Sequence, residues 1–405
     1  MNNKYLISKY LVKTDPKTEE VLNTKTGVRH EVSDETLKLL ELFSHQPKSI
    51  NEALAQIECG EAERRDIYIF IEALIAEQLL VAHLSKEATI QAKCDANAVI
   101  FESPMRSFFS VPIASKESLD GIDIAFVGVP FDLGTTGYPG ARFAPDRMRE
   151  LSSDTFEYHA DIFTGKGKGW WSADTGAHLL RGQALADFGN VLLQVGEGYD
   201  SFYERVTLAT STLLRAGIFP ILVGGDHSLS FAALRSFKYF YEDIKIVHID
   251  AHTDMGELIP GIPNNHGNVF TRIMQDNLAM NLFQIGVRGT AGKQVSVNNY
   301  KIISLCNLYQ VGIKESLSEL NGGNYYLSID IDVLDPSFAP GTGTPVSKGM
   351  DPTTLISLIS EISHKVNIVG MDIVEINPML DRNDQTSELG LSIILHVLSE
   401  VFSCP

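Results

Sequence analysis

Histidine and aspartate side chains gather in three short clusters, and each cluster directly follows a short apolar run. The clusters contain His227, then Asp250, His252 and Asp254, and finally Asp330 and Asp332. The apolar runs cover 219–223, 244–249 and 325–329, and their composition is typical of strands buried on both faces. Such side chains meet at the carboxyl edge of a parallel sheet. So many charges in one place need compensation, and two divalent cations would supply it.

The donor types narrow the choice of metal. Carboxylates with a minority of imidazoles, and no thiolate, favour Mn(II), with Fe(II), Ni(II) and Zn(II) as alternatives. Asp250 and His252 stand at i and i+2, as do Asp330 and Asp332, so each pair shares one face of an extended strand. A lone Asp-x-Asp is more typical of a turn, and a lone His of a structural residue. The three clusters together predict a binuclear centre that activates water.

The same clusters resemble those of the ureohydrolases, the arginase and agmatinase family, and several motifs are closer to the agmatinase-like branch. The resemblance covers roughly 120–400 and includes Gly128-Val-Pro-Phe-Asp-Leu-Gly-Thr, Pro139-Gly-Ala-Arg-Phe-Ala-Pro, Gln284-Ile-Gly-Val-Arg-Gly, Ser328-Ile-Asp-Ile-Asp-Val-Leu-Asp-Pro, Gly341-Thr-Gly-Thr-Pro and Gly370-Met-Asp-Ile-Val-Glu-Ile-Asn-Pro. It implies a three-layer α/β fold with a central, mainly parallel sheet, a homo-oligomer, and hydrolysis of linear amidines to urea and an amine.

Roles for individual residues follow from this resemblance. It implies two Mn(II) per subunit, one bound by His227 and Asp254, the other by His252 and Asp332, and both bridged by Asp250 and Asp330.

The resemblance also implies catalytic roles for three residues. Glu375 matches the carboxylate that holds the guanidinium, a planar cation that pairs best with a carboxylate fork. His266 matches a proton shuttle, for which an imidazole is suited. Asp254, besides binding metal, would steady the tetrahedral intermediate with the two ions. The alternatives are a buried ion-pair partner for Glu375 and a solvated turn histidine for His266.

Composition limits the classes of partner and the compartment. The net charge is −18, from 33 Lys and Arg against 51 Asp and Glu, which argues against nucleic acid or an anionic membrane and suits a cationic substrate. The four cysteines have no metal or redox spacing and are typical of reduced thiols. No apolar segment has the length of a signal peptide core or a membrane span, so we expect a cytoplasmic protein.

The N-terminal residues do not belong to the ureohydrolase pattern. We expect a winged-helix-like domain over 1–88, a linker over 89–118 and the catalytic domain over 119–405. The small domain would contain strands at 5–13, 20–22 and 79–82, a hairpin turn at 23–27, and helices at 34–43, 50–57 and 61–78. Ser33 and Ser49 are the expected N-caps of the first two helices.

This N-terminal segment resembles PqqD-like domains, which bind the leader peptides of ribosomally made, modified peptides by adding them as a strand to a sheet edge. The features that match are Val21-Leu-Asn-Thr-Lys-Thr-Gly-Val-Arg-His-Glu-Val-Ser and Ile71-Glu-Ala-Leu-Ile-Ala-Glu-Gln-Leu-Leu. An oligomerisation arm or a cover for the active site would be equally compatible. The absence of a basic stripe on the candidate recognition helix disfavours DNA binding.

The choice of substrate depends on the loop over 255–266. It is apolar and proline-rich where arginases use polar groups to bind the α-carboxylate and α-amino group, so free arginine is disfavoured. Agmatine and a peptide arginine both lack a free α-carboxylate. The Gly-rich insertion over 161–174, with Trp170 and Trp171, offers aromatic surface to a chain, or packs onto the core or a neighbouring subunit.

The hypothesis is therefore a peptide arginase, which converts arginine residues of a precursor peptide to ornithine and releases urea. An agmatinase, a guanidinobutyrase or another hydrolase of a small guanidino compound is the alternative within the class. From other classes, a single-zinc deacetylase and a catalytically inactive regulator stay open.

Overall fold

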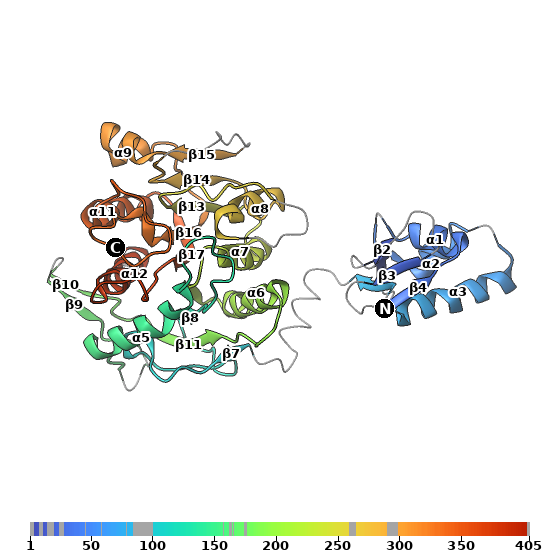
Figure 1. Cartoon of the computed structure of the whole chain (residues 1–405). Helices are drawn as coiled ribbons and strands as arrows, with labels where there is room; N and C mark the ends of the chain where they lie inside the picture. The colour runs from blue at the N-terminus through green and yellow to red at the C-terminus, as the bar shows by residue number, and fades with distance from the viewer. Residues whose placement is uncertain are drawn as a thin grey trace. The chain divides into compact units, whose positions relative to one another are not determined.

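The computed structural model divides the chain into two compact units, Met1–Ala96 and Asn97–Pro405 (Figure 1). The residues that it describes are 4–7, 11–13, 20–23, 28–44, 46–57, 59–77, 79–83, 100–156, 158–161, 164, 166–173, 176–258, 265–289 and 299–402.

A nine-stranded sheet forms the centre of the second unit. In spatial order its strands are β15 (Tyr300–Ile303), β14 (Leu282–Ile285), β13 (Lys245–Ile249), β16 (Asn324–Asp330), β17 (Asn367–Val374), β12 (Phe219–Val223), β8 (Ile124–Gly128), β11 (Leu185–Val191) and β7 (Phe101–Glu102). Each pair of neighbours is parallel except β11 and β7, which are antiparallel. The strands expected from the apolar runs are confirmed to within one residue at each end, because a strand covered on both faces is apolar throughout.

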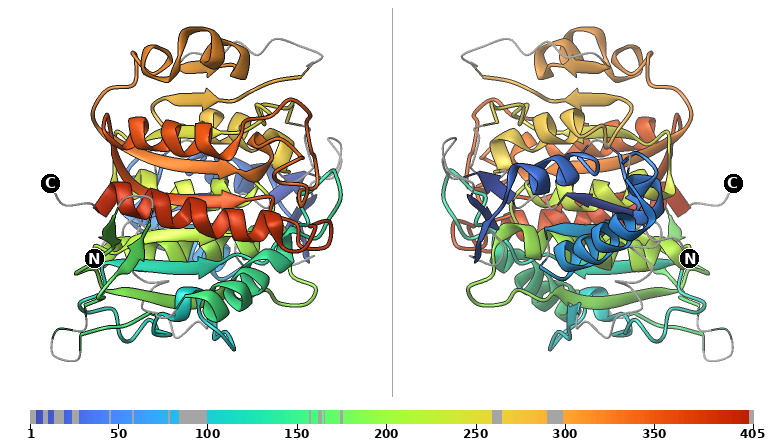
Figure 2. Two further views of the ribbon diagram at one scale, coloured as in Figure 1. Left: turned by 90° about the vertical axis from the view of Figure 1, so that its left-hand side faces the viewer. Right: turned by 90° about the vertical axis from the view of Figure 1, so that its right-hand side faces the viewer.

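Helices cover both faces of this sheet, which confirms the expected three-layer α/β fold (Figures 1 and 2). One face carries α6 (Tyr199–Arg215), α7 (Leu229–Phe240) and α8 (Val269–Gln275). The other carries α5 (Ala144–Thr155), α9 (Leu305–Val311), α11 (Pro352–Ser363) and α12 (Gln385–Phe402), with the short α10 (Ile313–Ser316) after α9. Each face has its own apolar cluster, so the sheet is dry on both sides.

Residues 100–118, which we expected in a linker, belong to the second unit. β7 closes one edge of the sheet, and the side chains of Phe108 and Phe109 in a short 3-10 turn (η1, Phe108–Ser110) are completely buried. A bridge between Ile113 and Asp187 extends the contact along β11. Burial of two aromatic rings outweighs the loop-like composition of this segment.

The glycine-rich insertion is more ordered than an open loop. Its two tryptophans lie on β9 (Trp170–Ser172), which pairs in a hairpin with β10 (Ala177–Leu179), a strand just after the insertion. The ring of Trp170 packs on Phe109, Phe156 and Tyr158, whereas Trp171 is 64% exposed. Of the two tryptophans, Trp171 therefore offers the larger exposed aromatic surface.

The first unit has a small hydrophobic core of its own, to which its helices contribute most of the buried side chains. It also contains two short sheets. The sheets have the orders β5–β1–β6 and β2–β3–β4, and all their described pairs are antiparallel. The strands are β1 (Lys4–Ile7), β2 (Leu11–Lys13), β3 (Glu20–Asn23), β4 (Val28–Glu31), β5 (Lys48–Ser49) and β6 (Leu80–His83), and the helices are α1 (Asp34–Glu41), α2 (Ile50–Leu54) and α3 (Glu61–Ala76).

In this unit the helix starts were predicted accurately from local sequence signals, whereas the arrangement of the strands was predicted less accurately. Ser33 and Ser49 cap α1 and α2 as expected, the latter in a complete capping box. The single strand expected over 5–13 is instead β1 and β2, which belong to different sheets. The expected turn over 23–27 lies almost entirely outside the described residues. The winged-helix-like assignment stays a prediction.

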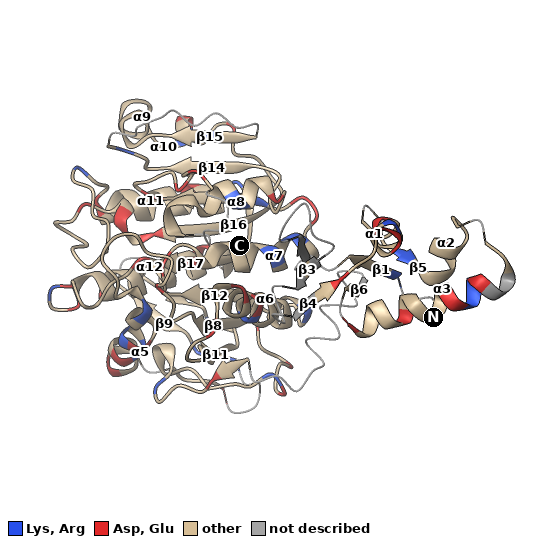
Figure 3. Cartoon of the chain, turned by 45° about the vertical axis from the view of Figure 1, so that its right-hand side comes forward, with Lys and Arg blue, Asp and Glu red and all other residues tan. Residues whose placement is uncertain are grey.

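The charges on α3 are mixed in sign. This helix carries Glu63, Arg64, Arg65, Asp66 and Glu72, so acidic and basic groups are interspersed along it (Figure 3). No helix among the described residues has both the length and the apolar composition needed to cross a bilayer.

A buried ion pair joins α5 to β11 and provides a test of the packing. Arg149 donates to both oxygens of Asp187, at 2.9 and 3.0 Å, and both side chains are almost completely buried. We expect Arg149→Met to lower the free energy of unfolding by about 3–5 kcal/mol, because it leaves a buried carboxylate without its cation. Chemical denaturation measures this. The control Arg106→Met removes the exposed pair with Asp154 and should change stability little; equal losses in the two variants would contradict the packing described.

Candidate metal centre

Four neighbouring strands bring the predicted metal ligands and the predicted catalytic residue Glu375 together at their carboxyl ends. β13 leads to Asp250, His252 and Asp254, β16 to Asp330 and Asp332, β12 to His227, and β17 to Glu375. These strands are consecutive in the sheet, in the order β13–β16–β17–β12. The sequence motifs are therefore adjacent because their strands are, as expected for the carboxyl edge of a parallel sheet.

The turn after β12 depends on two glycines. Gly224 and Gly225 have φ of 80° and 83°, in the left-handed region. A Cβ on Gly224 would lie 2.6 Å from Pro145, and one on Gly225 would lie 2.5 Å from the carbonyl oxygen of Val129. Only glycine fits this tight turn, which directs the side chain of His227 towards the neighbouring strand ends.

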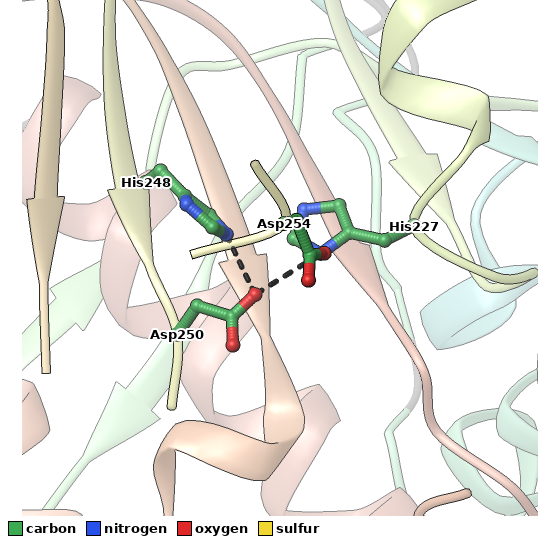
Figure 4. Close-up of side chains that lie close together, drawn as sticks. All are labelled: His227, His248, Asp250 and Asp254. Carbon is green, nitrogen blue, oxygen red and sulfur yellow. Dashed lines mark hydrogen bonds and ion pairs between the residues drawn. The ribbon is translucent and has the colours of Figure 1, made fainter. Parts of the chain in front are cut away.

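Three carboxylates surround one nitrogen of His227. Its Nδ1 lies 3.2 Å from an Oδ2 of each of Asp250, Asp254 and Asp330. This buried nitrogen has no hydrogen-bond partner among the described residues, although it faces three acceptors. Figure 4 shows His227, Asp250 and Asp254 converging. An unpartnered imidazole nitrogen beside carboxylate oxygens is the donor set of a divalent cation site.

A second group lies on the other side of Asp250. Nδ1 of His252 is 2.9 Å from Oδ2 of Asp332 and 3.5 Å from Oδ1 of Asp250. Asp250 thus presents Oδ2 to His227 and Oδ1 to His252. The described residues form two potential metal-binding groups that share this one carboxylate; the first also contains His248, and neither contains Asp330. Thr344 also donates its hydroxyl to Oδ2 of Asp332, at 3.2 Å.

Charged side chains lie close together in the metal-free centre, and their proximity shifts the pKa values of several of them. Burial opposes protonation of His227, but the three carboxylates raise its pKa well above the ordinary value. Burial opposes protonation of His252 as well, and Asp250 and Asp332 raise its pKa to about 12. Burial and the charge of Asp250 raise the pKa of Asp332 to about 7. Protons therefore partly compensate this centre when cations do not.

His248 is a residue of this centre that the sequence motifs did not identify. It is completely buried, its Nε2 lies 2.7 Å from Oδ2 of Asp250, and its Nδ1 accepts from the amide of Gln284 at 2.7 Å (Figure 4). Tyr300 in turn donates to Oε1 of Gln284, at 2.6 Å. His248 stands at i−2 from Asp250, on the same strand face, and this spacing could have identified it from the sequence.

Glu375 and His266 lie together beside the metal-binding groups. Nδ1 of His266 is 3.0 Å from Oε1 of Glu375, which also accepts from the backbone N–H of His227 at 2.8 Å. Nε2 of His266 lies 2.7 Å from the hydroxyl of Thr136 and 2.9 Å from its backbone nitrogen. Burial opposes protonation of His266, but Glu375 raises its pKa to about 9.

Two of these residues have strained backbones. Asp254 and Glu375 have φ of 48° and 63°, a region that residues with a Cβ rarely adopt. Backbone hydrogen bonds hold both, from Phe270 N to the carbonyl of Asp254 and from Glu375 N to the carbonyl of Gly225. Such strain is characteristic of functional positions.

The residues present fit a pair of divalent cations, and this geometry on a three-layer α/β fold defines a metal-dependent hydrolase. A family model described as the arginase family matches residues 122–399. The chain belongs to the arginase family. It is a hydrolase of the ureohydrolase class with a His/Asp metal-binding site.

Individual relatives agree with this family. The chain is 31% identical over 303 residues to the mitochondrial agmatinase of Gallus gallus, covering 72% of this chain and 84% of the relative. It is 30% identical to the mitochondrial guanidino acid hydrolase of Homo sapiens, covering 72% and 81%. The solved structure of proclavaminate amidino hydrolase from Streptomyces clavuligerus superposes with a TM-score of 0.62 at 28% identity, covering 74% of this chain and 97% of that one.

Proton release should accompany metal binding. Because His227 and His252 have raised pKa values, both hold protons at neutral pH in the metal-free protein, and a cation must displace them. We expect Mn(II) to release on the order of two protons per subunit and to bind more tightly as the pH rises from 6 to 8. Calorimetric titration in two buffers of different ionisation enthalpy measures the release. Identical heats in the two buffers would contradict the electrostatics described.

Proposed function

We propose that this protein binds two Mn(II) ions and hydrolyses the guanidino group of its substrate to urea and an amine. His227 and Asp254 would hold one ion and His252 and Asp332 the other, with Asp250 and Asp330 shared. The observation that carries this assignment is Asp250, whose two oxygens face the two histidines separately. When bound, the two ions supply Lewis-acid chemistry that makes water nucleophilic near neutral pH.

Glu375 is suited to orient the guanidinium. Its Oε1 is fixed by the backbone N–H of His227 and by His266, while no described residue donates a hydrogen bond to Oε2. A carboxylate oxygen held beside the metal-binding groups offers a planar cation a strong, directional partner. The strained backbone of Glu375 fixes this orientation before substrate arrives.

His266 is suited to deliver a proton to the departing amine nitrogen. Because the pKa of His266 is raised to about 9, its imidazole carries a second proton at neutral pH, which it can donate. Thr136 and Glu375 contact its two ring nitrogens and so fix the plane of the ring. Asp254, next to His227, would steady the tetrahedral intermediate together with the ions.

We infer that the substrate is a guanidino compound without a free α-carboxylate. The loop over 255–266 is apolar, and its middle residues, 259–264, lie outside the described part of the chain. The name agmatinase supports a small guanidino compound such as agmatine, whereas the name guanidino acid hydrolase supports a small guanidino compound that carries an acid group.

A peptidyl arginine is the second candidate. The unit Met1–Ala96 lies entirely outside the family match and has its own core. β6 is an edge strand of one of its sheets, and β2 and β4 are the edges of the other. Edge strands of this kind accept an extended peptide as an additional strand. A precursor peptide would be recruited there, and its arginines would be converted to ornithines.

Removal of the Glu375 charge tests the catalytic assignment. We expect Glu375→Gln to lower kcat/KM for urea release by about 10–100-fold, because a charged hydrogen bond to the guanidinium is lost. Metal content should stay at two ions per subunit, since Glu375 is not assigned as a ligand. The exposed Glu388→Gln is the matched control and should keep full activity. Unchanged kinetics for Glu375→Gln would remove this residue from the mechanism.

A substrate panel separates the two candidates. Full-length, Mn-loaded protein is incubated with agmatine, 4-guanidinobutyrate, free arginine and arginine-containing peptides, and urea and peptide mass are measured. We expect turnover of agmatine or a similar small compound and at most slow turnover of free arginine. Conversion of peptide arginine alone, with no small-molecule turnover, would instead favour the peptide candidate. If the protein instead contained one zinc ion per subunit and released urea from none of these compounds, the result would contradict the ureohydrolase chemistry and favour a deacetylase.

A further inference from the structure

A buried chain of hydrogen bonds leads away from the metal-facing side of His227. Its Nε2 lies 2.8 Å from the hydroxyl of Ser328, and this hydroxyl lies 2.6 Å from Oδ1 of Asp372. All three side chains are completely buried. The chain therefore connects a proposed metal ligand to a carboxylate that is not itself among the proposed ligands.

The register of the sheet creates this chain. Ser328 on β16 and Asp372 on β17 are direct partners in the parallel pairing. Tyr326 stands at i−2 from Ser328, on the same strand face, and donates to Oδ2 of Asp372 at 2.8 Å. Ser230, from the first turn of α7, donates to the same oxygen at 2.5 Å. Asp372 thus accepts three hydroxyl groups, one on Oδ1 and two on Oδ2.

The chemistry of these groups fixes the direction of each hydrogen bond. A carboxylate only accepts, so Ser328 must use its single proton for Asp372. The oxygen of Ser328 can then only accept from His227, which places the imidazole proton on Nε2. Once a cation has displaced the extra proton of His227, the lone pair of the neutral imidazole is on Nδ1, the nitrogen that lies 3.2 Å from an oxygen of each of the three carboxylates. The ring also packs edge-on against Phe270, with centroids 5.3 Å apart.

We propose that Asp372 acts through Ser328 as a positioning residue that holds His227 in the tautomer whose Nδ1 binds a metal ion. This proposal rests on the binuclear centre proposed above and adds residues to it. The second ion is assigned to His252 and Asp332, and neither residue contacts Ser328 or Asp372. The positioning should therefore strengthen the binding of only one of the two ions. Groups that orient a metal-binding histidine in this way strengthen metal binding by about 10–100-fold.

Two substitutions test the proposal through metal binding itself. Ser328→Ala removes the acceptor for Nε2, and Asp372→Asn keeps the shape of the carboxylate but makes it able to donate to Ser328. Mn(II) titration of the metal-free protein, followed by the electron paramagnetic resonance of free Mn(II), resolves the two binding events. In each variant we expect one event to weaken by about 10–100-fold and the other to keep the wild-type affinity.

Ser236→Ala is the matched control. Ser236 is also a completely buried serine of α7 and bonds to Ser211 and to the carbonyl of Thr207, so its loss costs a buried hydroxyl away from the centre. We expect both binding events to be unchanged in this variant. Thermal unfolding of the metal-free variants, measured in parallel, distinguishes a local effect on His227 from general loosening of the fold.

The outcomes separate this proposal from the proposed function. If the wild type binds two Mn(II) and releases urea while both variants bind both ions with wild-type affinity, the positioning role is overturned and the hydrolase chemistry stands. Equal weakening of both events in Ser328→Ala and Asp372→Asn, in proportion to a lower melting temperature, also overturns it, since the effect is then structural. A wild type that binds no pair of ions overturns the proposed function instead.

Discussion

The constraint on which this structure depends is the burial of several carboxylates at one edge of a sheet. Asp250, Asp330 and Asp332 are at most 2% exposed, and they lie on neighbouring strands. Unpaired charges in such a place cost several kcal/mol each. Protonated histidines compensate them only partly, and burial raises the pKa of Asp330 well above its usual value, with Asp332 and Asp250 contributing. Divalent cations resolve the conflict, so metal binding and the stability of this edge are two aspects of one electrostatic balance.

The fold positions these groups by rigid elements rather than by loops. Three of the proposed ligands, Asp250, Asp330 and Asp332, stand within two residues of a strand end. The other groups lie on tight turns that only particular backbones allow, such as the glycine pair before His227 and the left-handed conformations of Asp254 and Glu375. Each left-handed residue costs on the order of 1–3 kcal/mol, which the surrounding sheet must offset. Apolar burial on the two faces of the sheet provides the stabilising free energy that offsets this cost, since each face is covered by helices with an apolar cluster of its own.

The sequence was sufficient for the parts of the molecule that depend on local or strictly periodic signals. Runs of apolar residues located the central strands, and serines located two helix starts. His248 was missed because a histidine inside an apolar run is typical of a structural residue, and its contact with Asp250 depends on side-chain direction. Phe108 and Phe109 were missed for a related reason, because their burial arises from packing against β8 and α5, distant in the sequence.

The two units divide the problem of substrate choice. Among the described residues, the metal-binding groups and the pair of His266 and Glu375 all lie in Asn97–Pro405. In the proposed mechanism Glu375 would contact only the guanidinium of the substrate, which is the same in agmatine and in a peptide arginine. Selection between these substrates must therefore come from groups beyond the guanidinium. The edge strands of Met1–Ala96 could select only a substrate long enough to carry a separate recognition segment, and a small molecule has none. The length of the substrate, rather than its reacting group, is thus the property that decides whether the first unit takes part in recognition.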